Sequence, residues 1–154
     1  MRELSYAQAL NEALKQCMAE DERVILLGED VGVYGGIFQV SAGLLAEFGP
    51  SRVIDTPISE AGFVGAGVGA ALTGMRPVVE IMFIDFTTCA MDMIINQMAK
   101  MHYMFGGRGR VPMVLRTNIG AGRGTGAQHS QSFHHWDGNI IPAPIRDGLV
   151  QGIR

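Results

Sequence analysis

Hydrophobic and polar residues follow two different periods along this chain. Four short strands are predicted, and the first of them is an unbroken apolar run with the pattern of a strand that is buried on both faces of a sheet. They span residues 24–27, 52–55, 77–84 and 111–115. Between them, apolar residues recur at helical spacing after Ser5, over residues 44–48, after Ser59 and from about residue 87 to 104. Strands that alternate with helices predict an α/β fold of three layers, with a mostly parallel sheet flanked by helices.

Two serines stand where a side chain can cap a helix. Ser5 and Gln8 have capping-box spacing, and about four helical turns follow them. The helix after Ser59 is rich in small residues, although glycine inside a helix is costly. Its glycines, between Gly62 and Gly74, therefore indicate that another backbone or a cofactor approaches closely.

The chain divides into one domain and a tail of different composition. Residues 1–132 have regular periodicity and are long enough to bury a single core. Residues 133–154 carry two prolines and three glycines without a clean period. They predict an irregular or poorly packed tail.

Composition narrows the class of protein. Hydrophobic residues make up 47% and charged residues 18%, and the mean hydropathy is +0.19. So few charges indicate that another chain or domain covers part of the surface. The net charge is -3, and no basic face is apparent, so we expect no nucleic-acid partner.

The apolar stretches and the cysteines predict a cytoplasmic protein. The apolar runs are too short to span a bilayer, and the first residues lack the pattern of a secretory signal. Cys17 and Cys89 lie in helical apolar patterns, so we expect buried free thiols in a reducing compartment.

Carboxylates follow three of the predicted strands, where ligands bind in open parallel sheets. They lie in the segments Gly28-Glu29-Asp30, Asp55 to Glu60, and Asp85-Phe86. Glu60 begins a helix of glycine, alanine and valine, and burial there would raise its pKa as acid–base chemistry requires. The alternative is that Glu60 only stabilises the helix dipole.

The same helix contains a dinucleotide-binding pattern. Residues 65–70 read GAGVGA, which matches GxGxxA, and Asp85 follows Gly65 at the spacing of a ribose-binding acid. A nicotinamide-dependent oxidoreductase is therefore one rival hypothesis. The pattern is not preceded by a buried strand, and little room remains for the helix before residue 77, so the context opposes this rival.

Other side chains have both a functional and a structural interpretation. His129 follows a glycine-rich loop, where it is either a functional base or an exposed loop residue. Phe86 either floors a pocket or packs in the core. His134, His135 and Asp137 do not have the spacing of metal ligands, so we predict no metal site in this chain.

From about Leu4 to Ser132, the chain closely resembles the beta subunit of the thiamine diphosphate-dependent first component of 2-oxo acid dehydrogenase complexes, of the pyruvate and acetoin dehydrogenase type. The resemblance rests on five motifs in family order. They read LLGEDVGVYGG, RVIDTPISEAGFVGAGVGAALTGMRPVVEIMF, NQMAKMHYMFGG, VPMVLRT and AQHSQS. It implies a transketolase-type pyrimidine-binding domain, here incomplete and without the family's carboxy-terminal domain. It also implies that the glycine helix packs against a neighbouring subunit.

The resemblance implies roles for six residues. Glu60 of the ISE motif would hydrogen-bond the ring nitrogen of the aminopyrimidine of thiamine diphosphate and favour the imino tautomer that removes the thiazolium proton. Phe86 matches the aromatic residue that stacks on the aminopyrimidine, and Met82 and Ile58 match its apolar neighbours.

Two further matches concern proton and acyl transfer, and the absence of one motif concerns the diphosphate and Mg²⁺ site. Glu29 matches an acid in the polar channel between paired active sites. His129 matches the histidine associated with acyl transfer to the lipoyl arm. The diphosphate and Mg²⁺ site of the family is held by an alpha subunit, whose GDG motif does not occur here.

The resemblance therefore predicts a beta-type subunit for the oxidative decarboxylation of a 2-oxo acid such as pyruvate, or for acetoin cleavage. Its expected partners are an alpha subunit, a second beta subunit in a heterotetramer, and the lipoyl domain of an acyltransferase. A second rival is a non-catalytic, truncated assembly module.

Overall fold

The computed structural model describes residues 2–132, which form a parallel four-stranded sheet. The strands are β1 (Val24–Gly28), β2 (Val53–Asp55), β3 (Arg76–Ile81) and β4 (Val114–Thr117). Their order is β2-β1-β3-β4, and each neighbouring pair is parallel. The predicted parallel sheet is confirmed, with β3 ending earlier and β4 beginning later than the apolar runs indicated.

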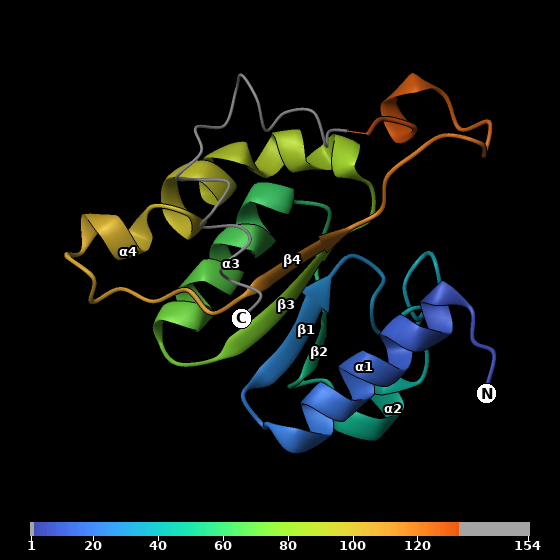
Figure 1. The fold of residues 1–154 in the computed structure, drawn as a ribbon, viewed down its shortest axis with the longest axis horizontal. Coiled ribbons are helices and arrows are strands. Elements are labelled where there is room, and N and C mark those ends of the chain that lie inside the picture. Colours follow the sequence, from blue (N-terminus) through green and yellow to red (C-terminus); the bar gives the residue numbers. More distant parts are fainter. Residues whose placement is uncertain (1, 133–154) are drawn as a thin grey trace.

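Helices cover both faces of this sheet, as predicted (Figure 1). The α-helices are α1 (Tyr6–Glu20), α2 (Leu44–Phe48), α3 (Glu60–Leu72) and α4 (Met101–Met104). Successive strand residues point to opposite faces. In β1, Val24 and Leu26 pack with the α1 and α2 side, whereas Ile25 and Leu27 join the core beneath α3.

The two predicted helix caps have different outcomes. At Ser5 the capping box is present, with Gln8 N donating to Ser5 Oγ over 3.2 Å and Ser5 N donating to Gln8 Oε1 over 2.9 Å. The Ser59 side chain forms no cap hydrogen bond, so that prediction is wrong. The backbone at Ser59 (φ -166°, ψ 75°) departs from the extended cap geometry of Ser5 (φ -67°, ψ 159°).

The glycines of α3 allow close packing within the chain itself. A Cβ at Gly65 would lie 3.1 Å from Met93 Sδ, and one at Gly67 would lie 2.6 Å from Val79 Cγ2. Close approach is present at these two positions, but the neighbours are side chains of the chain itself and not another backbone or a cofactor. At Gly69 a Cβ would meet nothing within 4 Å, so packing of this helix against another subunit stays a prediction there.

The long helix expected over residues 87–104 is present but is divided into three short helices of different type, and the residues between them keep a right-handed helical backbone. The three helices are the 3₁₀ helix η1 (Ile84–Ala90), the π-helix η2 (Met93–Met98) and α4. In η1, Thr87 Oγ1 donates to Ile84 O and Thr88 Oγ1 donates to Asp85 O, at 2.6 and 2.8 Å. These bonds reach back three residues and favour the tighter 3₁₀ turn over a continuous α-helix.

Cys17 and Cys89 are free thiols, as predicted, but both are exposed, so the prediction that they are buried was wrong. Cys17 precedes the buried Met18 on α1 and lies on the outward side of that helix. In the part of the chain that the structure describes, no helix has the length and apolar character needed to traverse a bilayer. The predicted irregular tail and the excluded metal ligands His134, His135 and Asp137 lie outside the described residues.

Candidate functional site

The topology gathers the predicted site residues at one edge of the sheet. Glu29 follows β1, Glu60 begins α3 after β2, and Phe86 lies in η1 after β3. His129 ends the short 3₁₀ helix η3 (Ala127–His129), which follows β4. Because all four strands are parallel, their carboxyl ends meet at this edge, where ligands bind in such sheets.

Glu29 is a buried carboxyl group close to a second one. It is 7% exposed, and its Oε1 has no hydrogen-bond partner among residues 2–132. Burial raises the pKa of Glu29, and the negative charges of Glu60 and Asp30 raise it further. Glu60 itself is half-buried as the first residue of α3, so both its helix-dipole role and an acid–base role are open to it.

The loop that carries Glu29 is held by close backbone contacts. The carboxylate of Asp55, at the end of β2, accepts hydrogen bonds from Gly32 N at 2.6 Å and from Val33 N at 3.4 Å. A Cβ at Gly32 would lie 2.5 Å from Asp55 Oδ2, and one at Gly28 would lie 2.5 Å from Glu80 O. Glycine is therefore required on both sides of Glu29, which fixes that loop against β2 and β3.

Phe86 and His129 meet in an aromatic cluster. The His129 ring lies edge-to-face with Phe86 at 5.1 Å and with Phe83 at 5.0 Å between centroids. Phe83 also contacts Phe86 and Phe38, with centroids 6.2 and 5.8 Å apart. His129 Nδ1 is buried without a hydrogen-bond partner among the described residues. The sequence prediction missed Phe83, which lies near the end of the apolar run over residues 77–84, before Phe86.

Two other predicted residues stand apart from this cluster. Ile58 is 85% exposed and packs in no core. Met82 is half-buried, and its carbonyl accepts a hydrogen bond from Asn118 Nδ2 at 3.0 Å. The structure thus brings Glu29 near Glu60 and Phe86 against His129, while the cofactor contacts of Ile58 and Met82 stay predictions.

A buried ion pair escaped the sequence prediction. The β3–β4 register places Glu80 opposite Arg116, and Glu80 Oε2 pairs with Arg116 Nη1. Their side chains are 1% and 12% exposed. The sequence signal for this pair was a glutamate inside the apolar run over residues 77–84 and an arginine directly after the run over residues 111–115. Such a pair fixes the register of β4, because losing either partner leaves a buried charge uncompensated.

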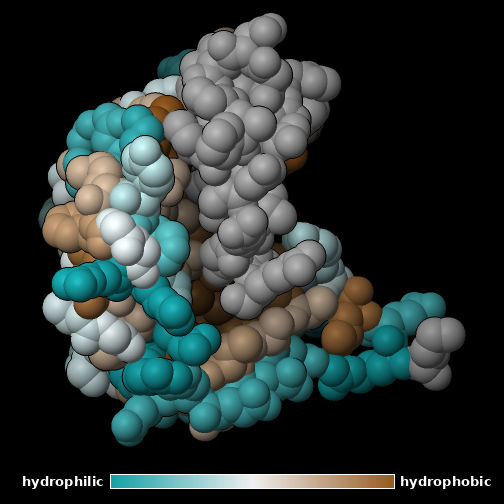
Figure 2. All heavy atoms as spheres, turned by 60° about the vertical axis from the view of Figure 1, so that its left-hand side comes forward, coloured by the Kyte–Doolittle hydropathy of each residue, from teal (hydrophilic) through white to brown (hydrophobic). Residues whose placement is uncertain are grey.

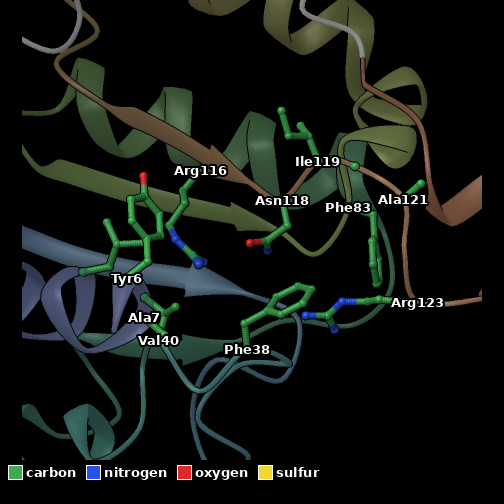
Figure 3. A pocket seen from close by; sticks show the side chains of 12 residues that line it. Tyr6, Ala7, Phe38, Val40, Phe83, Arg116, Asn118, Ile119, Ala121 and Arg123 are labelled. Atoms are coloured by element: carbon green, nitrogen blue, oxygen red, sulfur yellow. The ribbon is translucent and has the colours of Figure 1, made fainter. Parts of the chain in front are cut away.

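A hollow of about 260 Å³ lies beside β4, on the face that carries α1 (Figure 3). Phe38, Val40 and Phe83 give it apolar walls, and Arg116 and Arg123 also line it with their guanidinium groups. The Arg123 guanidinium stacks over the Phe38 ring at 4.0 Å. None of the six predicted site residues lines this hollow.

The GxGxxA pattern lies where it cannot act as a dinucleotide-binding turn. Residues 65–70 lie inside α3, whereas a nicotinamide fingerprint requires a turn between a strand and a helix. Asp85 is buried, and its Oδ1 accepts a hydrogen bond from Gln131 N. Within residues 2–132, no group of three or more histidine, cysteine or acidic residues is arranged to hold a metal ion.

Residues 2–138 match the family described as the transketolase, pyrimidine binding domain. This chain belongs to that family. The resemblance inferred from the five motifs is thereby confirmed at the level of the domain, and so is the predicted fold class.

The similar proteins are beta subunits of dehydrogenases. The chain is 49% identical over 145 residues to the acetoin:2,6-dichlorophenolindophenol oxidoreductase subunit beta of Bacillus subtilis, covering 86% of this chain and 42% of that one. It is 50% identical over 139 residues to the mitochondrial pyruvate dehydrogenase E1 component subunit beta-1 of Oryza sativa, covering 90% and 37%. The chain therefore spans about two fifths of the length of these relatives.

A solved structure agrees with the fold. The split gene transketolase, described as an inactive beta4 tetramer, has a TM-score of 0.57 and 21% sequence identity. The match covers 79% of this chain and 35% of that one. At this identity it supports the architecture alone.

Proposed function

We propose that this chain is the pyrimidine-binding part of a beta-type subunit in a thiamine diphosphate-dependent dehydrogenase of a 2-oxo acid such as pyruvate, or of acetoin. The observation that carries the proposal is the position of Glu60. It begins α3 at the carboxyl edge of the sheet, close enough to Glu29 for its charge to raise the pKa of that residue. Roughly half identity to pyruvate and acetoin dehydrogenase beta subunits supports it.

The residues present fit the aminopyrimidine end of thiamine diphosphate. A half-buried carboxylate, Glu60, is available to a ring nitrogen, and the half-buried Phe86 offers an aromatic surface nearby on η1. Met82 and Ile58 are the apolar side chains that we propose to flank the ring. Thiamine diphosphate supplies the electron sink for decarboxylation when it is bound.

The chain's own carboxyl groups would manage protons in this site. Glu60 would hold the proton at the aminopyrimidine ring nitrogen. Glu29, with its raised pKa and its unpartnered Oε1, is suited to exchange a proton within a buried polar path. His129, fixed against Phe83 and Phe86, would act at the later acyl transfer to lipoamide.

The proposed partners supply what the described residues do not contain. We propose that an alpha subunit holds Mg²⁺ and the diphosphate, that a second beta subunit completes a heterotetramer, and that a lipoyl domain receives the acyl group. Large exposed hydrophobic residues include Tyr103, Met104 and Phe105, on α4 and just beyond it. In Figure 2, hydrophobic residues are mixed with hydrophilic ones on the side turned forward. Partner surfaces of this mixed kind are usual in protein complexes.

We also propose a cytoplasmic location. Two exposed thiols that form no disulfide suit a reducing compartment. Several of the similar proteins carry the word mitochondrial in their names, so the compartment is to be tested by fractionation.

Glu60→Gln tests the proposed function. Residues 2–132 would replace the aligned segment of the Bacillus subtilis beta subunit, and the chimera would be assayed with the alpha subunit of that enzyme. We expect Glu60→Gln to leave assembly intact and to lower turnover by about 10²–10⁴-fold, the usual contribution of an acid–base group.

The matched control is Glu22→Gln, which removes an exposed carboxylate far from this edge and should leave turnover unchanged. Near-normal turnover of the Glu60→Gln chimera would refute the proposed role. A chimera that assembles but is inactive even with Glu60 intact would favour the second candidate, a non-catalytic assembly module.

A further inference from the structure

Asp85 is a buried carboxyl group to which the proposed chemistry gives no role. It is 5% exposed at the beginning of η1. Its Oδ1 accepts a hydrogen bond from Gln131 N at 3.3 Å. A buried carboxylate is costly unless hydrogen bonds satisfy it. This contact therefore joins η1 to the segment that directly follows His129.

The loop between β4 and His129 is closed at its neck. Gly120 N donates to Gln131 O at 3.0 Å, which brings the two ends of the loop together. At the first end, Ile84 N donates to Asn118 O at 2.8 Å. At the other end, Asp85 holds Gln131. Between the two ends, residues 121–128 are exposed. The loop is thus fixed to η1 at its base, and in its exposed part Arg123 stacks on the Phe38 ring.

His129 lies at the fixed base, two residues before Gln131. Its ring packs edge-to-face on Phe83 and Phe86, which flank Asp85 in sequence. We propose that Asp85 is a positioning residue that holds His129 against these two rings through the backbone of Gln131. The inference rests on the proposed function, which gives His129 its part in acyl transfer.

Two substitutions of Asp85 distinguish a positioning role from a merely structural one. In Asp85→Asn the amide oxygen can still accept from Gln131 N, so His129 stays in place. In Asp85→Ala the acceptor is lost, and the His129 segment separates from η1. Asp92→Ala is the control, because the carboxylate of Asp92 accepts from Asn96 on the neighbouring helix instead.

The test is NMR on the full chain, with the His129 ring signals assigned by their loss in His129→Gln. We expect ring currents of Phe83 and Phe86 to shift these signals in the unaltered chain, in Asp85→Asn and in Asp92→Ala, and the shift to vanish in Asp85→Ala. We also expect the Gln131 amide to exchange with solvent about tenfold more slowly in the unaltered chain than in Asp85→Ala, as one charge-assisted hydrogen bond implies.

An unchanged His129 shift in Asp85→Ala would overturn the proposal. If that variant does not fold, the unaltered chain decides: a Gln131 amide exchanging as fast as the loop-tip amides would overturn it, and a protected one would support it. Neither measurement depends on activity. A positioned His129 together with a normal lipoamide reaction in His129→Ala would therefore contradict the proposed function and leave this inference standing.

Discussion

At the scale of residues, Glu29 and His129 each have a polar atom whose hydrogen-bonding capacity is not satisfied by the surrounding groups. Glu29 Oε1 and His129 Nδ1 are both buried without a hydrogen-bond partner in the described part of the chain. Leaving a polar atom unpaired costs stability. Both side chains lie at the edge where parallel strands present ligands, so this cost is consistent with retention for function.

Glu29→Gln should change stability in a pH-dependent manner. The folded-state pKa of Glu29 is raised above its ordinary value of 4.5, so the protonated form favours the fold. Its contribution to stability is complete below about pH 4.5 and is lost as the pH rises through the folded-state pKa. Glutamine resembles the protonated form, so we expect a higher free energy of unfolding than that of the unaltered chain at pH 7 and no gain at pH 4.

Denaturant unfolding of both chains at the two pH values measures this difference. Glu20→Gln at the exposed end of α1 serves as the control and should show no such pH dependence. Equal effects of Glu29→Gln at pH 4 and pH 7 would contradict a raised pKa.

His129→Ala should separate two half-reactions. We expect it to impair acyl transfer to lipoamide more than decarboxylation measured with an artificial electron acceptor, since the proposed role of this histidine follows carbon dioxide release. The chimera with the Bacillus subtilis beta subunit is the material for both assays. Equal losses in the two assays would show that His129 acts at another step or only structurally.

At the scale of elements, α3 shows why small residues are needed in one helix. Gly67 faces β3 so closely that a methyl group would overlap Val79 Cγ2. Gly69 lies two residues further along the same helix, and a Cβ there would meet nothing within 4 Å. Packing within the chain therefore requires glycine at position 67 of this helix, whereas it does not require glycine at position 69.

Gly67→Ala and Gly69→Ala should have opposite effects. Overpacking typically costs about 1–3 kcal/mol, so Gly67→Ala should lower the free energy of unfolding although alanine favours helix. Gly69→Ala should raise it by about 0.5–1 kcal/mol through helix propensity alone. Urea unfolding of the full chain distinguishes them. If Gly69→Ala stabilises the chain but weakens its assembly with an alpha subunit, the predicted subunit contact of α3 gains support; unaffected assembly argues against it.

At the scale of the whole molecule, the proposed function makes the described residues one part of a site shared with a partner chain. They bring carboxyl and aromatic groups to one edge of a sheet, and β4 lies at the end of that sheet next to an open hollow. Exposed hydrophobic side chains such as Tyr6, Tyr103 and Phe105 are spread over different elements. The proposed function therefore needs partner chains, which would complete the cofactor site and cover the exposed hydrophobic side chains.

The chain alone should bind magnesium thiamine diphosphate weakly or not at all. An aminopyrimidine pocket offers one ring contact and a few hydrogen bonds of about 1 kcal/mol each, too little to offset the entropy of association. Mg²⁺ and the diphosphate require oxygen ligands, which we assign to the alpha subunit. Calorimetry on the purified chain measures this. Micromolar binding by a clean monomer would mean that the diphosphate site had been misplaced.

The sequence by itself determined the parallel α/β architecture, because short apolar strands alternate along the chain with segments of helical periodicity. It also placed Glu29, Glu60, Phe86 and His129 after separate strands, which parallel topology alone brings to one edge. The family resemblance came from motifs whose order along the chain is local information.

Only the tertiary structure decided which of these groups touch. Periodicity cannot show that Thr87 and Thr88 bond back to the backbone, so it did not reveal the 3₁₀ geometry of η1. The sequence pattern grouped Cys17 with the apolar residues of α1, whereas the structure leaves Cys17 exposed next to the buried Met18. The contacts of Asp85 with Gln131 and of Glu80 with Arg116 join residues 46 and 36 positions apart. Such contacts depend on strand order and register, which packing of the whole domain fixes.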